Sequence, residues 1–342
     1  MTPLLHPFLV NDRFGDPALY VEFLFEKRAL LFDLGDLHGL ETRKILRLSD
    51  IFVSHAHIDH FIGFDRVLRV LMGRDKRLRL FGPAGFIDRV AHRLGGFTWN
   101  LVARYAADLV FTVMEVHSES EARTAEFHLS RAFRREAERD LRLHEGLVLD
   151  DGGFKLRAAR LDHRIPCLGF AIEEQAHVNV WKNRLDEQGL PTGPWLRELK
   201  QAVLRGEPDD MAFRVWWREA GETRERHFPL GRLKQEVLEI VPGQKIGYVV
   251  DAVYSEANRE KIVELVRGAD ILFIEAAFAR DETARAAERC HLTTEQAGRL
   301  ARLAGARRLE PFHFSPRYAG QEERLRREVE EAFQCVGQGG EA

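Results

Sequence analysis

Four side chains that can bind a metal ion lie between residues 55 and 60. Residues 54 to 60 read Ser-His-Ala-His-Ile-Asp-His, which supplies His55, His57, Asp59 and His60. Imidazole nitrogen and carboxylate oxygen are ligands that suit zinc, and also manganese or iron(II). An open position on such a metal ion makes water a nucleophile near neutral pH. The spacing therefore predicts hydrolysis; the alternative is a surface loop whose histidines have no ligand role.

The residues immediately before this cluster predict the element that positions it. Asp50-Ile51-Phe52-Val53-Ser54 is a short apolar run of the kind that forms a buried strand. The four candidate ligands would then leave the end of a strand and enter a loop. Rigid strands are good platforms for metal sites, so this placement favours the metal-site interpretation.

The pattern His-x-His-x-Asp-His after a strand resembles the signature of the metallo-β-lactamase superfamily. The resemblance implies an α/β fold, an αβ/βα four-layer sandwich of the metallo-β-lactamase type, and a centre of two divalent metal ions. One ion would take His55, His57 and His163, the other Asp59, His60 and His313, and Asp251 would bridge the two. Zinc is the expected metal, with manganese or iron as alternatives.

Within that superfamily, several segments resemble ribonuclease Z, the endonuclease that removes the 3′ trailer of precursor transfer RNA. The segments at 162–170 and 313–318, Asp-His-Arg-Ile-Pro…Gly-Phe and His-Phe-Ser-Pro-Arg-Tyr, resemble two of its motifs. Those around Glu275 and His291 resemble two others and imply a proton donor, His291, that Glu275 orients. Alternatively, His291 lies in the capping region of the following helix and has no catalytic duty. Asp59 would orient or deprotonate the attacking water as well as bind metal.

Two further features follow from the same resemblance. Asp33, after the apolar run 29–32, is interpreted as a residue that orients a ligand histidine without touching the metal. Gly193, Pro194 and Lys200 resemble the arm with which ribonuclease Z grips the transfer RNA elbow. The chain departs from the family at its opening, residues 8–17, where the Gly-Thr part of the family's opening motif is absent.

Length and composition indicate a single catalytic domain over residues 1–342, with 45% hydrophobic and 31% charged residues. We expect a helix-like insertion at about 118–144, because its Arg and Glu residues alternate, and an arm at about 175–242. No run of about 20 apolar residues and no signal-peptide pattern appear, so we expect a cytoplasmic protein without a membrane span. The three cysteines form no paired motif.

Three functions remain open from the sequence. The first is endonucleolytic removal of transfer RNA 3′ trailers, with the precursor as partner and the chain acting alone or as a homodimer. The second is hydrolysis of small phosphodiesters or other esters on the same frame, which the altered opening favours. The third is an RNA- or partner-binding protein without turnover. A net charge of −3 gives no support to nucleic-acid binding, although the arm segment 177–206 has a small excess of positive charge.

Overall fold

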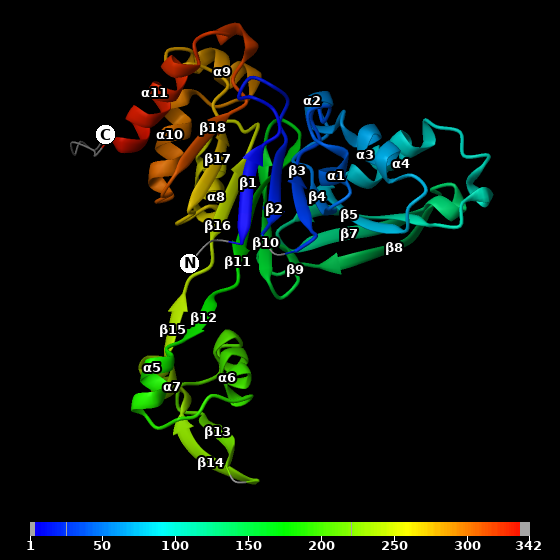
Figure 1. Ribbon diagram of the computed structural model, residues 1–342. Coiled ribbons are helices and arrows are strands. Elements are labelled where there is room, and N and C mark those ends of the chain that lie inside the picture. The colour runs from blue at the N-terminus through cyan, green and yellow to red at the C-terminus, as the bar shows by residue number, and fades with distance from the viewer. Residues whose placement is uncertain (1–3, 25, 220, 336–342) are drawn as a thin grey trace. The chain divides into compact units, whose positions relative to one another are not determined.

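The computed structural model describes residues 4–24, 26–219 and 221–335, and these divide into two compact units (Figure 1). The main unit contains Met1–Glu173 and Gln244–Ala342, and the inserted unit contains Glu174–Gly243. We expected one domain that carries an arm at about 175–242. The arm residues instead form a unit with a hydrophobic cluster of its own.

The first large sheet of the main unit has the strand order β1-β2-β3-β4-β5-β6-β7-β8. Its strands are β1 Leu5–Leu9, β2 Leu19–Phe23, β3 Ala29–Phe32, β4 Leu48–Phe52, β5 Lys76–Pro83, β6 Leu109–Ser118, β7 Glu121–His128 and β8 Arg135–Arg142. Strands β3 to β6 run parallel, and the flanking pairs are antiparallel. The helices between them are α1 Thr42–Ile45, α2 Ile58–Phe61, α3 Phe64–Leu71 and α4 Phe86–Gly95, with short 3-10 turns at Val102–Arg104 and Leu129–Arg131.

The second large sheet has the order β18-β17-β16-β11-β10-β9. Its strands are β9 Leu147–Asp150, β10 Phe154–Asp162, β11 Pro166–Glu174, β16 Lys245–Val249, β17 Ile271–Glu275 and β18 Leu309–Phe312. Its helices are α8 Glu256–Leu265, α9 Thr283–Arg289, α10 Thr294–Leu303 and α11 Glu322–Gln334, with a 3-10 turn at Pro316–Tyr318. Strands β16, β17 and β18 are parallel, so their carboxyl ends meet at one edge.

Three hydrophobic clusters define four layers in the main unit. Phe32 and Phe52 of the first sheet pack against Phe170 and Tyr248 of the second, which makes the sandwich core. The outer face of the first sheet is covered by α1, α3 and α4, and that of the second by α8, α10 and α11 (Figure 1). The expected αβ/βα four-layer sandwich is therefore confirmed.

The prediction of a helix-like insertion at about 118–144 is wrong, because this segment forms β7, β8 and the ends of their neighbours. Alternating charges suit a helix surface, but here they form pairs across strands: Arg123 faces Asp140, and Glu121 faces Arg142. The apolar residues of this segment, Phe127, Leu129 and Phe133, are buried in the core.

The inserted unit forms two small sheets, β12-β15 and β13-β14, and three helices within its described residues. The bounds are β12 His177–Val180, α5 Lys182–Glu187, α6 Trp195–Leu204, β13 Ala212–Glu219, β14 Glu222–Pro229, α7 Leu230–Val237 and β15 Leu238–Val241. Trp195 is fully buried, and its indole donates a hydrogen bond to the Pro191 carbonyl at 3.0 Å. Gly193 and Pro194 therefore lie at the start of α6, and Lys200 lies within it.

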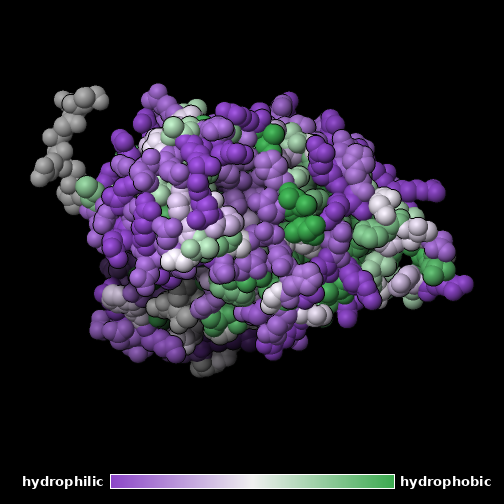
Figure 2. All heavy atoms as spheres, turned by 90° about the horizontal axis from the view of Figure 1, so that it is seen from above, coloured by the Kyte–Doolittle hydropathy of each residue, from purple (hydrophilic) through white to green (hydrophobic). Residues whose placement is uncertain are grey.

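Large apolar side chains are concentrated in these clusters, and the face of the molecule in Figure 2 is mostly hydrophilic, with hydrophobic residues in small separate groups. Among the described residues, no helix is long and apolar enough to span a membrane.

Candidate metal centre and active site

All seven candidate metal ligands lie at or just beyond the carboxyl ends of strands of the main unit. His55 and His57 follow β4, and Asp59 and His60 lie in the short helix α2. His163 follows β10, Asp251 follows β16, and His313 follows β18. The sandwich thus brings residues from both sheets to one edge, as the apolar segments before each of them require.

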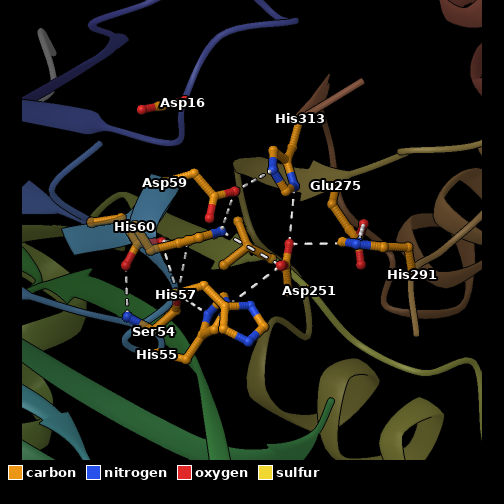
Figure 3. A network of polar contacts seen from close by, with 12 residues as sticks. Asp16, Ser54, His55, His57, Asp59, His60, Asp251, Glu275, His291 and His313 are labelled. Atoms are coloured by element: carbon orange, nitrogen blue, oxygen red, sulfur yellow. Dashed lines mark hydrogen bonds and ion pairs between the residues drawn. The ribbon is translucent and has the colours of Figure 1, made fainter. Parts of the chain in front are cut away.

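Three groups of potential ligand atoms result, and within each group the atoms lie within 4.8 Å of one another (Figure 3). The groups are His55, His57, His163 and Asp251; Asp59, His60 and His313; and Asp251, Glu275, His291 and His313. The first two match the two ligand sets that the family resemblance implied. By contrast, Gly193, Pro194 and Lys200 belong to the inserted unit and to none of these groups.

Asp251 lies between the histidine groups. Its Oδ2 is 3.4 Å from His55 Nε2, 3.5 Å from His60 Nε2 and 3.5 Å from His163 Nε2. Its Oδ1 is 2.9 Å from His313 Nδ1. One carboxylate therefore faces both sets, which is the position that a bridging ligand needs.

Several buried polar atoms at this centre have no hydrogen-bond partner among the described residues. They are His60 Nε2, Asp251 Oδ1 and His313 Nδ1. Asp251 Oδ1 and His313 Nδ1 lie at ion-pair distance but lack hydrogen-bond geometry. Burying unpaired polar atoms is costly unless another partner is present. Nitrogen and carboxylate donors left unpaired at one point fit divalent cations, so this donor set matches a two-metal centre.

The electrostatics of the protein alone show how strongly these groups interact. Burial, reinforced by the charge of His60, lowers the pKa of His55 to about 2. Burial also acts to lower the pKa of His313, but the Asp251 and Asp59 carboxylates outweigh it and raise that pKa to about 10. Burial acts to raise the pKa of Asp59, but His313 and His60 hold it well below its usual range. Asp59 is therefore an ionised acceptor at neutral pH.

Asp33 contacts the candidate metal ligand His60 at Nδ1, the ring nitrogen that does not face Asp251. It is fully buried; its Oδ2 lies 2.9 Å from His60 Nδ1 and accepts hydrogen bonds from Ser54 Oγ at 2.8 Å and Tyr248 Oη at 2.9 Å. Its Oδ1 accepts from the Ser54 amide at 2.6 Å. A carboxylate on Nδ1 leaves Nε2 of His60 facing the centre, where it can bind metal. Sequence reasoning identified Asp33 but missed Tyr248, because nothing in its own strand distinguishes it from a core aromatic residue.

Glu275, which is fully buried, and His291, which is half-buried, form a second pair at the edge of the centre. Their Oε2 and Nδ1 atoms lie 2.9 Å apart. Burial acts to lower the pKa of His291, but the Glu275 carboxylate outweighs it and raises the pKa. The cap of the following helix is Thr293, which forms a capping box with Gln296, so His291 is not needed as the cap.

Backbone strain is concentrated at the same edge. Asp33, Asp251 and His313 have positive φ angles of 58°, 45° and 57°, in the left-handed region that non-glycine residues seldom adopt. Cys290, with φ 64°, presents its carbonyl oxygen 2.8 Å from Nδ1 of the ligand candidate His163. Such conformations cost about 1–3 kcal/mol each and persist where the surroundings impose them, typically at functional sites.

A cavity of about 660 Å³ opens over the cluster. It is lined by five of the candidate ligands, His57, Asp59, His163, Asp251 and His313, and by His291. The loop after β1 contributes Phe14 and Asp16 to its wall. Three arginines also line it: Arg285, Arg289 and Arg317. Sequence reasoning included Arg317 only within the motif-like segment 313–318 and gave it no role. It missed Arg285 and Arg289, which carry no motif signal of their own.

Comparison with known proteins agrees with this geometry. A family model described as a beta-lactamase superfamily domain matches residues 236–314. Ribonuclease Z of Deinococcus radiodurans is 33% identical over 293 residues, which covers 84% of this chain and 83% of that protein. Ribonuclease Z of Limosilactobacillus fermentum is 28% identical over 313 residues, covering 89% and 83% respectively.

Solved structures show the same fold at low sequence identity. The metallo-β-lactamase fold protein YhfI of Bacillus subtilis aligns with a TM-score of 0.52 at 14% identity, covering 94% of this chain and 87% of that one. The short form of human tRNase Z aligns with a TM-score of 0.50 at 19% identity, covering 92% of each chain. With a relative one-third identical over most of both sequences, this chain belongs to the ribonuclease Z family, metal-dependent hydrolases of the metallo-β-lactamase superfamily.

Proposed function

We propose that this protein is an endoribonuclease that removes 3′ trailers from transfer RNA precursors. The observation that carries the proposal is the position of Asp251, whose carboxylate faces candidate ligands of both proposed metal sites. Its Oδ2 faces His55, His163 and His60, and its Oδ1 faces His313. The names of the relatives, ribonuclease Z and tRNase Z, support the substrate. Action in the cytoplasm and assembly into a homodimer stay predictions.

The proposed metal ligands are those of the two sets described above. His55, His57 and His163 would hold one ion, Asp59, His60 and His313 the other, and Asp251 both. Zinc suits these donors, and manganese and iron are the alternatives. When bound, two such ions supply an activated water nucleophile and neutralise charge on the phosphate oxygens.

Side chains of the protein would accept and donate the protons that move during the reaction. Asp59 is ionised at neutral pH and lines the cavity, so it can orient the attacking water and accept its proton. His291, on the cavity wall, would donate a proton to the leaving oxygen from its Nε2, since Nδ1 faces Glu275. The Glu275 carboxylate would keep His291 protonated and fix its orientation. Gly193, Pro194 and Lys200 of the inserted unit would contact the body of the transfer RNA.

The decisive experiment is cleavage of a precursor transfer RNA with a 3′ trailer by metal-loaded protein, read on a denaturing gel. We expect one cut at the trailer junction, loss of the cut after treatment with a chelator, and its return with zinc, manganese or iron added singly. Asp59→Asn and His163→Ala should abolish cleavage without a change in circular dichroism. Asp140→Asn, the same change at an exposed position, is the matched control.

The outcomes separate the alternatives. Metal-dependent hydrolysis of bis-p-nitrophenyl phosphate without RNA cleavage would move the protein to the small-phosphodiester function. RNA binding without hydrolysis of either substrate would favour the binding protein. Full activity of Asp59→Asn would contradict the two-metal proposal itself.

A further inference from the structure

The cavity over the metal cluster has one wall rich in arginine. Arg285 and Arg289 stand four residues apart on α9, so they lie on the same face of that helix. Arg317, in the 3-10 turn Pro316–Tyr318, lines the same cavity. Arg289 precedes the proposed proton donor His291 by two residues, and both line the cavity, so this wall would lie beside the leaving oxygen.

The arginine wall keeps an excess of positive charge after its ion pairs are counted. Glu282 pairs with Arg317, whose Nη1 is 3.2 Å from both carboxylate oxygens. Arg285 Nη1 is 3.6 Å from the same carboxylate, and both arginines therefore share one acidic partner. Within the part of the chain that the structure describes, Arg289 has no carboxylate partner. Arg289 is an exposed residue. Three cations against one anion leave a wall able to accept negative charge from a ligand.

The positive charge of the arginine wall contrasts with the net negative charge of the whole chain. The whole chain has a net charge of −3, and residues 174–243 contain eleven Lys and Arg against twelve Asp and Glu. The inserted unit therefore brings no net positive charge of its own. On the other side of the cavity, Asp16 stands near Asp59 and away from His291 (Figure 3). Phosphate groups would be repelled there and attracted toward α9.

We propose that Arg285 and Arg289 bind phosphate groups that flank the scissile phosphodiester on the side of the leaving oxygen. This inference rests on the proposed endoribonuclease function and narrows it: the site selects a polynucleotide over a small diester, since a small diester has no flanking phosphate. A guanidinium group offers a planar fork of donors that matches phosphate oxygens. Arg317 is held by Glu282 and shapes the wall instead.

The test compares Arg285→Gln/Arg289→Gln with Arg326→Gln/Arg327→Gln, in the metal-loaded full-length protein. The second pair removes the same charge from exposed positions of α11 that do not line the cavity. The substrates are a precursor transfer RNA and bis-p-nitrophenyl phosphate. A transcript without a trailer, which cannot be cleaved, reports binding by fluorescence anisotropy at several salt concentrations.

We expect the ratio of kcat/KM for RNA to kcat/KM for the small diester to fall roughly tenfold in the cavity variant, since each replaced arginine takes away a charge-assisted hydrogen bond that solvent screens at these exposed positions. The slope of log Kd against log salt concentration should decrease by about 1.4 in magnitude, about 0.7 for each phosphate that is no longer neutralised. The α11 variant should change neither quantity. Arg285→Lys/Arg289→Lys, which keeps the charge, should recover most of the salt slope.

Two results would overturn the inference. If the parent protein cleaves RNA and the cavity variant keeps both the ratio and the salt slope, the arginine subsite is wrong while the proposed function stands. If the parent protein cleaves no RNA at any salt concentration, both fail together.

Discussion

One oxygen of the Glu275 carboxylate contacts His291, and the other contacts the loop that carries Asp251, the candidate bridging ligand. Oε2 lies 2.9 Å from His291 Nδ1, and Oε1 accepts a hydrogen bond from the Ala252 amide at 2.8 Å. Ala252 follows Asp251 directly, so one buried carboxylate fixes both the proposed proton donor and the loop that carries the bridge. A positioning role of Glu275 follows from this geometry.

Replacing His291 by glutamine should lower kcat roughly 10²- to 10⁴-fold, the usual contribution of a general acid, with a smaller change in KM. Glu275→Gln should lower kcat less, because Gln can still accept from the Ala252 amide. Without the carboxylate, the pKa of His291 falls, so the alkaline limb of the kcat–pH profile should move to lower pH. Steady-state kinetics on precursor transfer RNA across pH measure both, because the sugar oxygen that leaves from RNA needs a proton, whereas p-nitrophenolate leaves without one. An unshifted profile in Glu275→Gln would remove the positioning role.

Asp33→Asn should weaken metal binding roughly 10- to 100-fold, because a ligand histidine loses the carboxylate that orients it. Tyr248→Phe removes one of the hydrogen bonds to Asp33 and should weaken metal binding by a smaller factor. Tyr20→Phe is the matched control. The Tyr20 hydroxyl donates to the Lys44 carbonyl at 3.1 Å, and Tyr20 belongs to the cluster between the first sheet and its covering helices. Competition with a chromogenic chelator measures the affinities; equal effects of the two Tyr variants would contradict the network.

Excision of the inserted unit should separate RNA cleavage from small-diester hydrolysis. Glu173 and Lys245 are antiparallel partners on β11 and β16, so a short glycine-rich turn can join them after residues 174–244 are removed. We expect hydrolysis of bis-p-nitrophenyl phosphate to remain and cleavage of precursor transfer RNA to be largely lost. A shorter deletion, of residues 185–205, is less suitable because it would remove Leu185, Trp195 and Leu199 from the hydrophobic core of the inserted unit.

A point variant controls for the excision. Lys200→Gln keeps the inserted unit folded and should reduce RNA cleavage in the same direction but by a smaller factor. If excision lowers RNA cleavage and hydrolysis of the small diester equally, the unit covers the site as a lid.

The pair between His128 and Asp108 should make stability depend on pH. Partial burial acts to lower the pKa of His128, but Asp108, 2.9 Å away, and Glu126 raise it. The pair therefore stabilises the fold below the unfolded pKa of about 6.5 and loses that contribution as pH rises through the folded pKa. Because the pair is near the surface, we expect a difference in Tm below about 4 °C between the parent protein and His128→Gln, larger at pH 6 than at pH 9. His144→Gln, with an 84% exposed side chain, should show no such dependence.

The candidate metal ligands were visible in the sequence because each set follows a segment whose apolar residues suit a buried strand. A parallel or sandwich sheet ends such strands at one edge, so the order of His55, His163, Asp251 and His313 already indicated convergence. The segment at 118–144 was misread for the opposite reason. Its charges repeat in a way that satisfies both a helix surface and a cross-strand ladder, and only the burial of Phe127 against the core decides between them.

The sequence by itself determined the ligand types, their order along the chain and the strands that carry them, because these depend on local pattern. The tertiary structure decided which side chains share a partner. Tyr248 and Asp33 are 215 residues apart in sequence and form a hydrogen bond, and Arg289 lines the same cavity as Asp16. Such contacts depend on how two sheets and their connections pack, a property of the whole chain that no local periodicity encodes.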